Sequence, residues 1–297
     1  MIPRRNGTTY VVLVSLVAAM GGLLFGYDWV VIGGAKPFFE KYFSLDSENL
    51  RGWANSCALL GCLLGSILSG GLSDKFGRKR LLLASGVLFA VSSVLTGWAY
   101  SFHAFVAWRM VGGVAIGMAS NLSPVYIAEI APARLRGRLV AMNQLTIVIG
   151  ILAAQIVNWM IAEKVPDGAV AEVIRQSWNG QYGWRWMFTV VAVPSVLFFL
   201  LTMIVPESPR WLVKNGKDDL SRQILARIGG VGHAQTELQE IRATLALEEI
   251  QRVRLADLLE PRLLKVLCLG CTLAVLHQWS GINVIFNYAE EIFRQAG

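Results

Sequence analysis

Charged residues are scarce in this sequence of 297 residues, where Asp, Glu, Lys and Arg together make up only 16%. A soluble domain of ordinary composition carries about 25% charged residues. Apolar residues make up 55% of the chain, and the mean hydropathy is +0.51. They gather in runs long enough to cross a bilayer as helices. The shortage of charge together with these runs excludes an ordinary soluble domain and indicates an integral membrane protein.

Histidine and cysteine are also few, with three and four residues respectively. Cys268 and Cys271 form a C-x-x-C pair, a spacing compatible with redox or metal chemistry. All four cysteines lie in apolar runs without a Cys/His pair nearby, so we interpret them as small packing residues. No nucleophile–base or metal-ligand pattern occurs either. We therefore expect no metal, no cofactor and no enzymatic activity.

The net charge of +7 is compatible with nucleic-acid binding, but the basic residues lie between the apolar runs rather than on one soluble face. Membrane topology explains them better, so we expect no nucleic-acid partner. Most Lys and Arg fall in loops that share one side if the N-terminus is cytoplasmic. The first run is too long for a typical signal peptide, and we expect it to be retained as a span.

Seven membrane spans are predicted, which places the C-terminus outside. They are Tyr10–Ile32, Trp53–Leu72, Leu81–Tyr100, Phe105–Ile127, Leu139–Ala162, Trp186–Val205 and Leu263–Phe286. From Ser208 to Glu260 the chain turns polar, with mixed charges and apolar residues at helical spacing. This part predicts short amphipathic helices at Asp218–Gln223, Glu237–Leu247 and Glu249–Leu259 on the cytoplasmic side.

One carboxylate, Asp28, lies inside the first predicted span, in the sequence Phe25-Gly26-Tyr27-Asp28. An ionised Asp near the bilayer centre costs about 2.5–3.5 kcal/mol on insertion scales, so it usually faces a cavity and has a function. Arg109 lies in the fourth span and needs an acceptor or water. We interpret it as the partner of Asp28, the alternative being an Arg that snorkels to the surface.

A stretch similar to part of the first span occurs late in the chain, where Ser280-Gly281-Ile282-Asn283 resembles Phe25-Gly26-Tyr27-Asp28. Two helices that carry Gly-x-Asp or Gly-x-Asn at matching places suggest two related halves, each giving one helix to a shared centre.

Three loop motifs are longer and more specific. Gly70 to Arg80 has the spacing G-x-x-x-D-K-x-G-R-K-R. Pro124 to Glu129 reads P-x-Y-x-x-E and is followed by R-G, and Pro206 to Leu212 reads P-E-S-P-R-W-L. The first resembles the signature loop of the major facilitator superfamily, and the other two resemble motifs of its sugar porter family. That family includes bacterial xylose–proton symporters and mammalian glucose facilitators.

The resemblance implies an all-α membrane protein with the major facilitator fold. Residues 1–207 would form the N-terminal six-helix transmembrane bundle, built as a 3+3 inverted repeat, and residues 208–261 a cytoplasmic helical linker domain. Residues 262–297 would hold the first helix of the C-terminal bundle, whose other helices are missing. We expect a multi-pass protein of the cell membrane.

The resemblance also implies the working residues. A sugar needs many neutral donors and acceptors, which amides supply; the expected sugar-binding residues are Phe25, Gln144, His277, Gln278 and Asn283. His277 stands where the family commonly has Gln, which leaves the sugar open. The expected inner gate is a salt-bridge network of Asp74, Arg78, Arg80, Glu129, Arg136, Glu207 and Arg210.

Transport of a monosaccharide with protons, across the lipid bilayer, is the function that the resemblance favours. Xylose–proton symporters of the family carry Asp at the position of Asp28, whereas glucose facilitators commonly carry Asn, which cannot exchange a proton. Asp28 and Arg109 are therefore the expected proton-coupling pair. Two alternatives stay open: a sugar uniporter, and a truncated, non-transporting fragment that needs its missing C-terminal half as a partner.

Overall fold

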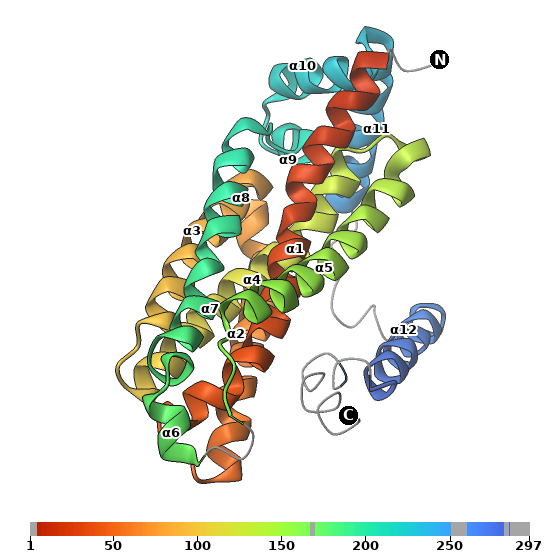
Figure 1. Ribbon diagram of the computed structural model, residues 1–297. Coiled ribbons are helices and arrows are strands. Elements are labelled where there is room, and N and C mark those ends of the chain that lie inside the picture. Colours follow the sequence, from red (N-terminus) through yellow and green to blue (C-terminus); the bar gives the residue numbers. More distant parts are fainter. Residues whose placement is uncertain (1–4, 167–169, 251–259, 282–284, 286–297) are drawn as a thin grey trace.

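The computed structural model describes residues 5–166, 170–250, 260–281 and 285, and every regular element among them is a helix (Figure 1). The elements are α1 (Arg5–Tyr42), α2 (Glu48–Phe76), α3 (Arg78–Gly97), α4 (Phe102–Ile130), α5 (Ala133–Ile161), α6 (Ala171–Gln176), the π-helix η1 (Asn179–Gly183), α7 (Trp184–Val190), α8 (Ala192–Ile204), α9 (Pro209–Lys214), α10 (Asp218–Gly229), α11 (Val231–Ile250) and α12 (Pro261–Trp279).

Six helices in the described part of the chain are long and apolar enough to cross a membrane: α1 to α5, and the continuous run Asn179–Ile204 that joins η1, α7 and α8. The first six predicted spans match them. Five of the observed helices are longer than predicted, whereas α3 has the predicted length and begins and ends three residues earlier. The first continues past the predicted end at Ile32 to Tyr42, because Phe38 and Phe39 pack in the core. The predicted all-α bundle with six spans is confirmed.

Close contact between α1 and α5 holds the centre of the bundle together (Figure 1). A Cβ added at Gly26 would lie 2.0 Å from the carbonyl oxygen of Ile147. Only glycine permits this approach of the two backbones, as small residues commonly do in membrane helices. On the same pair of helices, the Thr146 hydroxyl donates to the carbonyl of Ala19 at 2.6 Å. The helix with Asp28 is therefore fixed against the helix with Gln144.

A cluster of aromatic rings joins α1, α4 and α7 near the C-terminal end of α1. The Phe39 ring centroid lies 5.0 Å from that of Phe105, 6.4 Å from Trp184 and 6.5 Å from Phe188. All four side chains are buried, and aromatic pairs at such separations stabilise beyond their buried area. The cluster therefore joins α1 and α4 to α7 at this end of the bundle.

The helices α9, α10 and α11 cover the opposite end of the bundle, where the N-terminus also lies (Figure 1). The predicted linker helices differ from the observed ones in length. Instead of ending at Gln223, α10 continues to Gly229, and α11 runs through the predicted break after Leu247 to Ile250. Residues 251–259, which hold most of the third predicted helix, lie outside the described residues.

The short helix α9 was not predicted. Pro209 occupies its first turn, where a missing N–H costs nothing, and the Ser208 hydroxyl accepts from the backbone N–H of Trp211 at 3.3 Å. This N-cap begins a separate helix just after the sixth span, and that helix lies against the bundle.

The predicted seventh span, Leu263–Phe286, is only partly seen. Helix α12 ends at Trp279, and Gly281 follows with φ of +77°, a conformation that glycine adopts readily at helix ends. Its apolar part, Leu263–Trp279, is shorter than the six spanning helices. It stands apart from the bundle (Figure 1), and its described side chains are exposed. Residues 282–284 and 286 lie outside the described residues.

Candidate functional site

Asp28 and Arg109 form an ion pair in the interior of the bundle. The Nη1 of Arg109 on α4 donates to Oδ1 of Asp28 on α1 at 2.6 Å. Each residue is only 5% exposed, and the guanidinium also lies 5.3 Å from the ring centroid of Phe188. A buried pair of this kind is costly to desolvate, and removing either partner leaves an uncompensated charge.

A cavity of about 530 Å³ reaches this pair from one end of the bundle, between α1, α2 and α4. Phe25, Asp28 and Arg109 line it, together with polar side chains closer to the helix ends, among them Lys36, Glu40, Glu48, Arg51 and Asn55. The sequence did not predict this polar wall, because Lys36 and Glu40 lie beyond the predicted end of the first span. Asp28, Ile32, Lys36 and Glu40 follow one another at intervals of four residues, which places them on one face of a helix. This spacing could have predicted the polar wall.

The expected sugar-binding residues are not brought together in the described part of the chain. Gln144 is exposed on α5, and it does not line the cavity that Phe25 lines. His277 and Gln278 are exposed near the end of α12. Asn283 lies outside the described residues.

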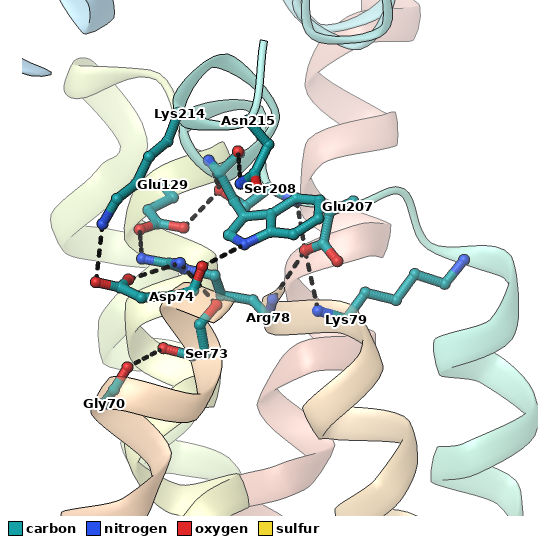
Figure 2. Close-up of polar contacts among 11 residues, drawn as sticks. Gly70, Ser73, Asp74, Arg78, Lys79, Glu129, Glu207, Ser208, Lys214 and Asn215 are labelled. Carbon is teal, nitrogen blue, oxygen red and sulfur yellow. Dashed lines mark hydrogen bonds and ion pairs between the residues drawn. The ribbon is translucent and has the colours of Figure 1, made fainter. Parts of the chain in front are cut away.

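The predicted inner gate lies at the end of the bundle that α9 covers (Figure 2). Arg78 is its centre: Nη2 pairs with Oε1 of Glu129 at 3.0 Å, and Nη1 with Oδ1 of Asp74 at 3.1 Å. The other carboxylate oxygen of Asp74 pairs with Nζ of Lys214 at 2.9 Å. The Arg78 and Glu129 side chains are only 9% and 11% exposed, so solvent screens this contact little.

Glu207 takes part through backbone N–H groups. Its Oε1 accepts the backbone N–H groups of Arg78 and Lys79, both at 3.0 Å, and that of Ser208 at 2.9 Å (Figure 2). Arg78 and Lys79 are the first residues of α3, and a carboxylate stabilises a helix at this end. Gly77 precedes them with φ of +98°, and a Cβ there would lie 2.3 Å from Oε2 of Glu207.

Several members of this network were not predicted. The Ser208 hydroxyl donates to Oε2 of Glu129 at 2.5 Å, and Nε1 of Trp211 donates to the carbonyl of Asp74 at 3.0 Å. The Tyr126 hydroxyl donates to the carbonyl of Pro206 at 2.6 Å. These residues fall inside the motifs quoted for the resemblance, which is the signal that could have pointed to them.

Two cations of the predicted network stand outside this arrangement. Arg80 and Arg136 are exposed, and neither makes an ion pair with another described residue. Arg210 lines a small pocket beside Asp74 and Arg78. Among the described residues there is also no group of three or more His, Cys, Asp or Glu side chains placed to hold a metal ion.

Comparison with known proteins agrees with the helical fold. A family model described as "Sugar (and other) transporter" matches residues 14–297. The glucose transport protein of a Synechocystis species is 40% identical over 97% of this chain and 60% of its own length. The arabinose–proton symporter of Bacillus subtilis is 39% identical over 100% of this chain and 61% of its own. The D-xylose–proton symporter of Escherichia coli is 36% identical over 99% and 62%.

Solved structures give the same result. The major facilitator superfamily proton:xylose symporter XylE, bound to 6-bromo-6-deoxy-D-glucose, superposes with a TM-score of 0.85 at 35% identity, over 98% of this chain and 64% of its own. A partially occluded, inward-open form of XylE from E. coli gives a TM-score of 0.83 at 35% identity, over 95% and 67%. The chain spans about 60% of the length of the curated relatives. It belongs to the sugar transporter family and has the major facilitator fold.

Proposed function

We propose that the full-length protein is a proton-coupled symporter that moves a monosaccharide across the cell membrane by alternating access. The observation that carries the proposal is the buried Asp28–Arg109 pair at the end of a cavity in a transmembrane bundle. Relatives named as arabinose–proton and D-xylose–proton symporters support the coupling to protons. The N-terminus and α9 to α11 lie on the cytoplasmic side in this proposal, as the Lys and Arg distribution favours.

Asp28 is the proton site. A carboxylate whose contact with Arg109 is made in one conformation and relaxed in another binds a proton with different affinity in the two conformations. By linkage, protonation then shifts the conformational equilibrium by the same free energy. In the present conformation this contact is 2.6 Å long and joins two buried side chains.

The network around Arg78 is the inner gate. It joins α2, α3, α4 and α9 through Asp74, Arg78, Glu129, Glu207 and Ser208. In the outward-facing state these contacts hold the cytoplasmic ends of the helices together, and they break when the inner side opens. Arg80 and Arg136 act around this centre as surface charges, and Arg210 lies beside Asp74 and Arg78.

The sugar is bound between this bundle and the second half of the carrier. Gln144 and Phe25 contribute from this bundle, and His277, Gln278 and Asn283 from the segment after the linker. The exposure of Gln144 supports this placement, because a polar amide on a membrane helix needs a partner or ligand on its open side. The relatives that carry glucose, arabinose and D-xylose favour a pentose or hexose as the sugar.

Uptake of labelled xylose, arabinose and glucose by cells that express the full-length gene tests the proposal. We expect accumulation of at least one sugar above its outside concentration, and its collapse when a protonophore dissipates the proton gradient. A sugar uniporter is the second candidate. Uptake that equilibrates without accumulation, and that a protonophore leaves unchanged, would favour the uniporter.

A further inference from the structure

Two aromatic rings line the cavity that ends at Asp28. Phe25 and Trp29 lie one turn apart on α1, with their ring centroids 6.0 Å apart and their planes at 23° to each other. The indole N–H of Trp29 is buried and has no acceptor among the described residues, so the ring carbons face the cavity. Gly33, one turn further along α1, also lines the cavity and has no side chain to cover the indole. This wall of the cavity is therefore apolar and aromatic.

The wall formed by α2 carries neutral polar groups. Nδ2 of Asn55 donates to the carbonyl of Arg51, and Oγ of Ser56 donates to that of Gly52, both at 2.8 Å. Asn55 and Ser56 line the cavity and are partly exposed. These bonds use one donor of each side chain, which leaves the carbonyl oxygen and second N–H of Asn55 and the oxygen lone pairs of Ser56 for a ligand.

Charges of the two signs balance along the cavity. The lining holds three acidic and three basic side chains, namely Asp28, Glu40, Glu48, Lys36, Arg51 and Arg109. Asp28 pairs with Arg109 at the inner end, and at the mouth Arg51 pairs with Glu48 and lies 3.8 Å from Glu40. A ligand with a net charge would disturb this balance, so the cavity favours a neutral molecule.

A monosaccharide in its ring form matches these walls. It is neutral, one face of its ring presents C–H groups that stack on an aromatic side chain, and its hydroxyls both donate and accept. The volume of about 530 Å³ lies within the range of about 300–1,000 Å³ for small-molecule sites, which combine apolar and aromatic walls with a few polar groups. Phe25, which belongs to the proposed sugar site, connects the cavity to that site.

We infer that the cavity between α1, α2 and α4 is an outer binding site for a neutral monosaccharide, in which the sugar ring stacks on Trp29 and its hydroxyls bind Asn55. The inference rests on the proposed function, in which the carrier moves a monosaccharide, and it adds a site to the one between the two halves. A sugar that arrives from the outer side binds here first and then passes Phe25 to reach the second site.

Trp29→Leu and Trp29→Phe in the full-length carrier test the stacking. Leucine is apolar but has no ring, whereas phenylalanine keeps one. Initial uptake rates are measured for the sugar that the parent takes up fastest among labelled D-xylose, L-arabinose and D-glucose. We expect Trp29→Leu to raise KM by about tenfold with kcat unchanged, and Trp29→Phe to stay within about twofold of the parent. The Kd of the same sugar, measured by calorimetry on the purified carrier, should rise together with KM.

Asn55→Leu tests the wall on α2, because leucine has a similar size and no hydrogen-bonding group. We expect KM to rise by about fivefold, the effect of one lost hydrogen bond, with kcat unchanged. Trp53→Leu is the matched control. Trp53 is exposed two residues away on α2 and does not line the cavity, so its variant should keep the KM of the parent.

An unchanged KM in either Trp29→Leu or Asn55→Leu would overturn the inference. A rise in KM that Trp29→Phe shares in full would also overturn it, because Trp29 would then pack the bundle rather than bind the sugar ring. Failure of the proposed coupling has a different result: the parent would take up sugar without any alkalinisation of the medium, and the KM values of the variants would still decide whether the cavity binds the sugar.

Discussion

Arg109 is the residue on which the interior of the bundle depends most directly. Its guanidinium is buried and pairs with the Asp28 carboxylate at 2.6 Å, with the ring of Phe188 on another side. Breaking such a pair from one side leaves the other charge in the interior without compensation, which costs far more than the loss of an exposed contact.

The first prediction concerns the variant Arg109→Gln. We expect a loss of about 3–5 kcal/mol of stability, because Asp28 stays behind as a buried charge. The measurement is thermal unfolding of the purified protein in detergent. Arg175→Gln is the control: the Arg175–Glu172 contact is 3.8 Å long between exposed side chains, and its removal should cost about 0–1 kcal/mol. Equal melting temperatures for the two variants would contradict the account.

The second prediction concerns Gly77, which has φ of +98° and faces the Glu207 carboxylate. Gly77→Ala should destabilise by about 1–3 kcal/mol, because a Cβ in this conformation is strained and would lie 2.3 Å from Oε2 of Glu207. Gly70→Ala on α2 is the control, since no heavy atom lies within 4 Å of the added Cβ. Alanine there should be neutral or stabilising. A harmless Gly77→Ala would mean that the loop does not need its observed conformation.

At the scale of elements, the ends of four helices meet at Arg78. The last turn of α2 supplies Asp74, the first turn of α3 Arg78, the last turn of α4 Glu129, and the N-cap of α9 Ser208. In the proposed mechanism these contacts break when the cytoplasmic side opens. The network acts as a switch only if breaking it changes the ratio of the outward-facing to the inward-facing state.

The third prediction concerns the variant Glu129→Gln, which removes the charge that pairs with Arg78. We expect a full-length carrier to shift toward the inward-facing state. The rate at which Leu245→Cys, beside the network, reacts from the cytoplasmic side should rise by about fivefold, the effect of about 1 kcal/mol on a two-state ratio. In the control variant Glu172→Gln, which changes an exposed side chain on α6, the rate should stay the same. An unchanged rate in Glu129→Gln would show that this network is not the gate.

The elements themselves were largely predictable, because apolar runs between basic loops mark membrane helices whatever their partners. Their ends were not. Whether α1 stops at Ile32 or continues to Tyr42 depends on Phe39 packing against Phe105 and Trp184, which are far away in sequence. The separate helix α9 depends on the N-cap at Ser208, which the prediction had placed at the start of the polar linker without a helix.

The pair Asp28–Arg109 could be predicted because two opposite charges within apolar spans need each other. The contacts of Ser208 with Glu129 and of Trp211 with Asp74 could not be predicted. Both residues lie in a quoted motif, but neither polar group lies in a span where it would be costly alone, so the sequence did not indicate which partner it contacts. The polar wall of Lys36 and Glu40 was missed because those residues were assigned to a loop.

At the scale of the whole molecule, the bundle has a surface that its own helices do not cover. Gln144 is exposed there on α5, with apolar neighbours such as Leu145 and Leu152 at 59% and 60% exposure. Apolar side chains can face lipid, but a polar amide in the hydrocarbon region needs another group. The relatives are longer than this chain, and part of each relative has no counterpart in it.

The fourth prediction follows for the 297-residue chain expressed alone. We expect it to self-associate or to be unstable, and not to accumulate sugar, because Gln144 has no opposing wall. The measurement is sugar uptake by purified protein in liposomes with an imposed proton gradient, with its oligomeric state measured in detergent. Robust uptake by the 297-residue protein would overturn this prediction and with it the placement of the sugar between two halves.

The most direct measurement of the central claim is the pH of a weakly buffered medium around cells that express the full-length gene, recorded while sugar is added. The account predicts alkalinisation with the parent protein, because each sugar enters with a proton bound at Asp28. It predicts no alkalinisation with Asp28→Asn, which cannot exchange a proton yet still accepts a hydrogen bond from Arg109, and continued sugar counterflow in that variant. Clear sugar uptake by the parent protein without alkalinisation would contradict the claim and would leave Asp28 as a structural charge.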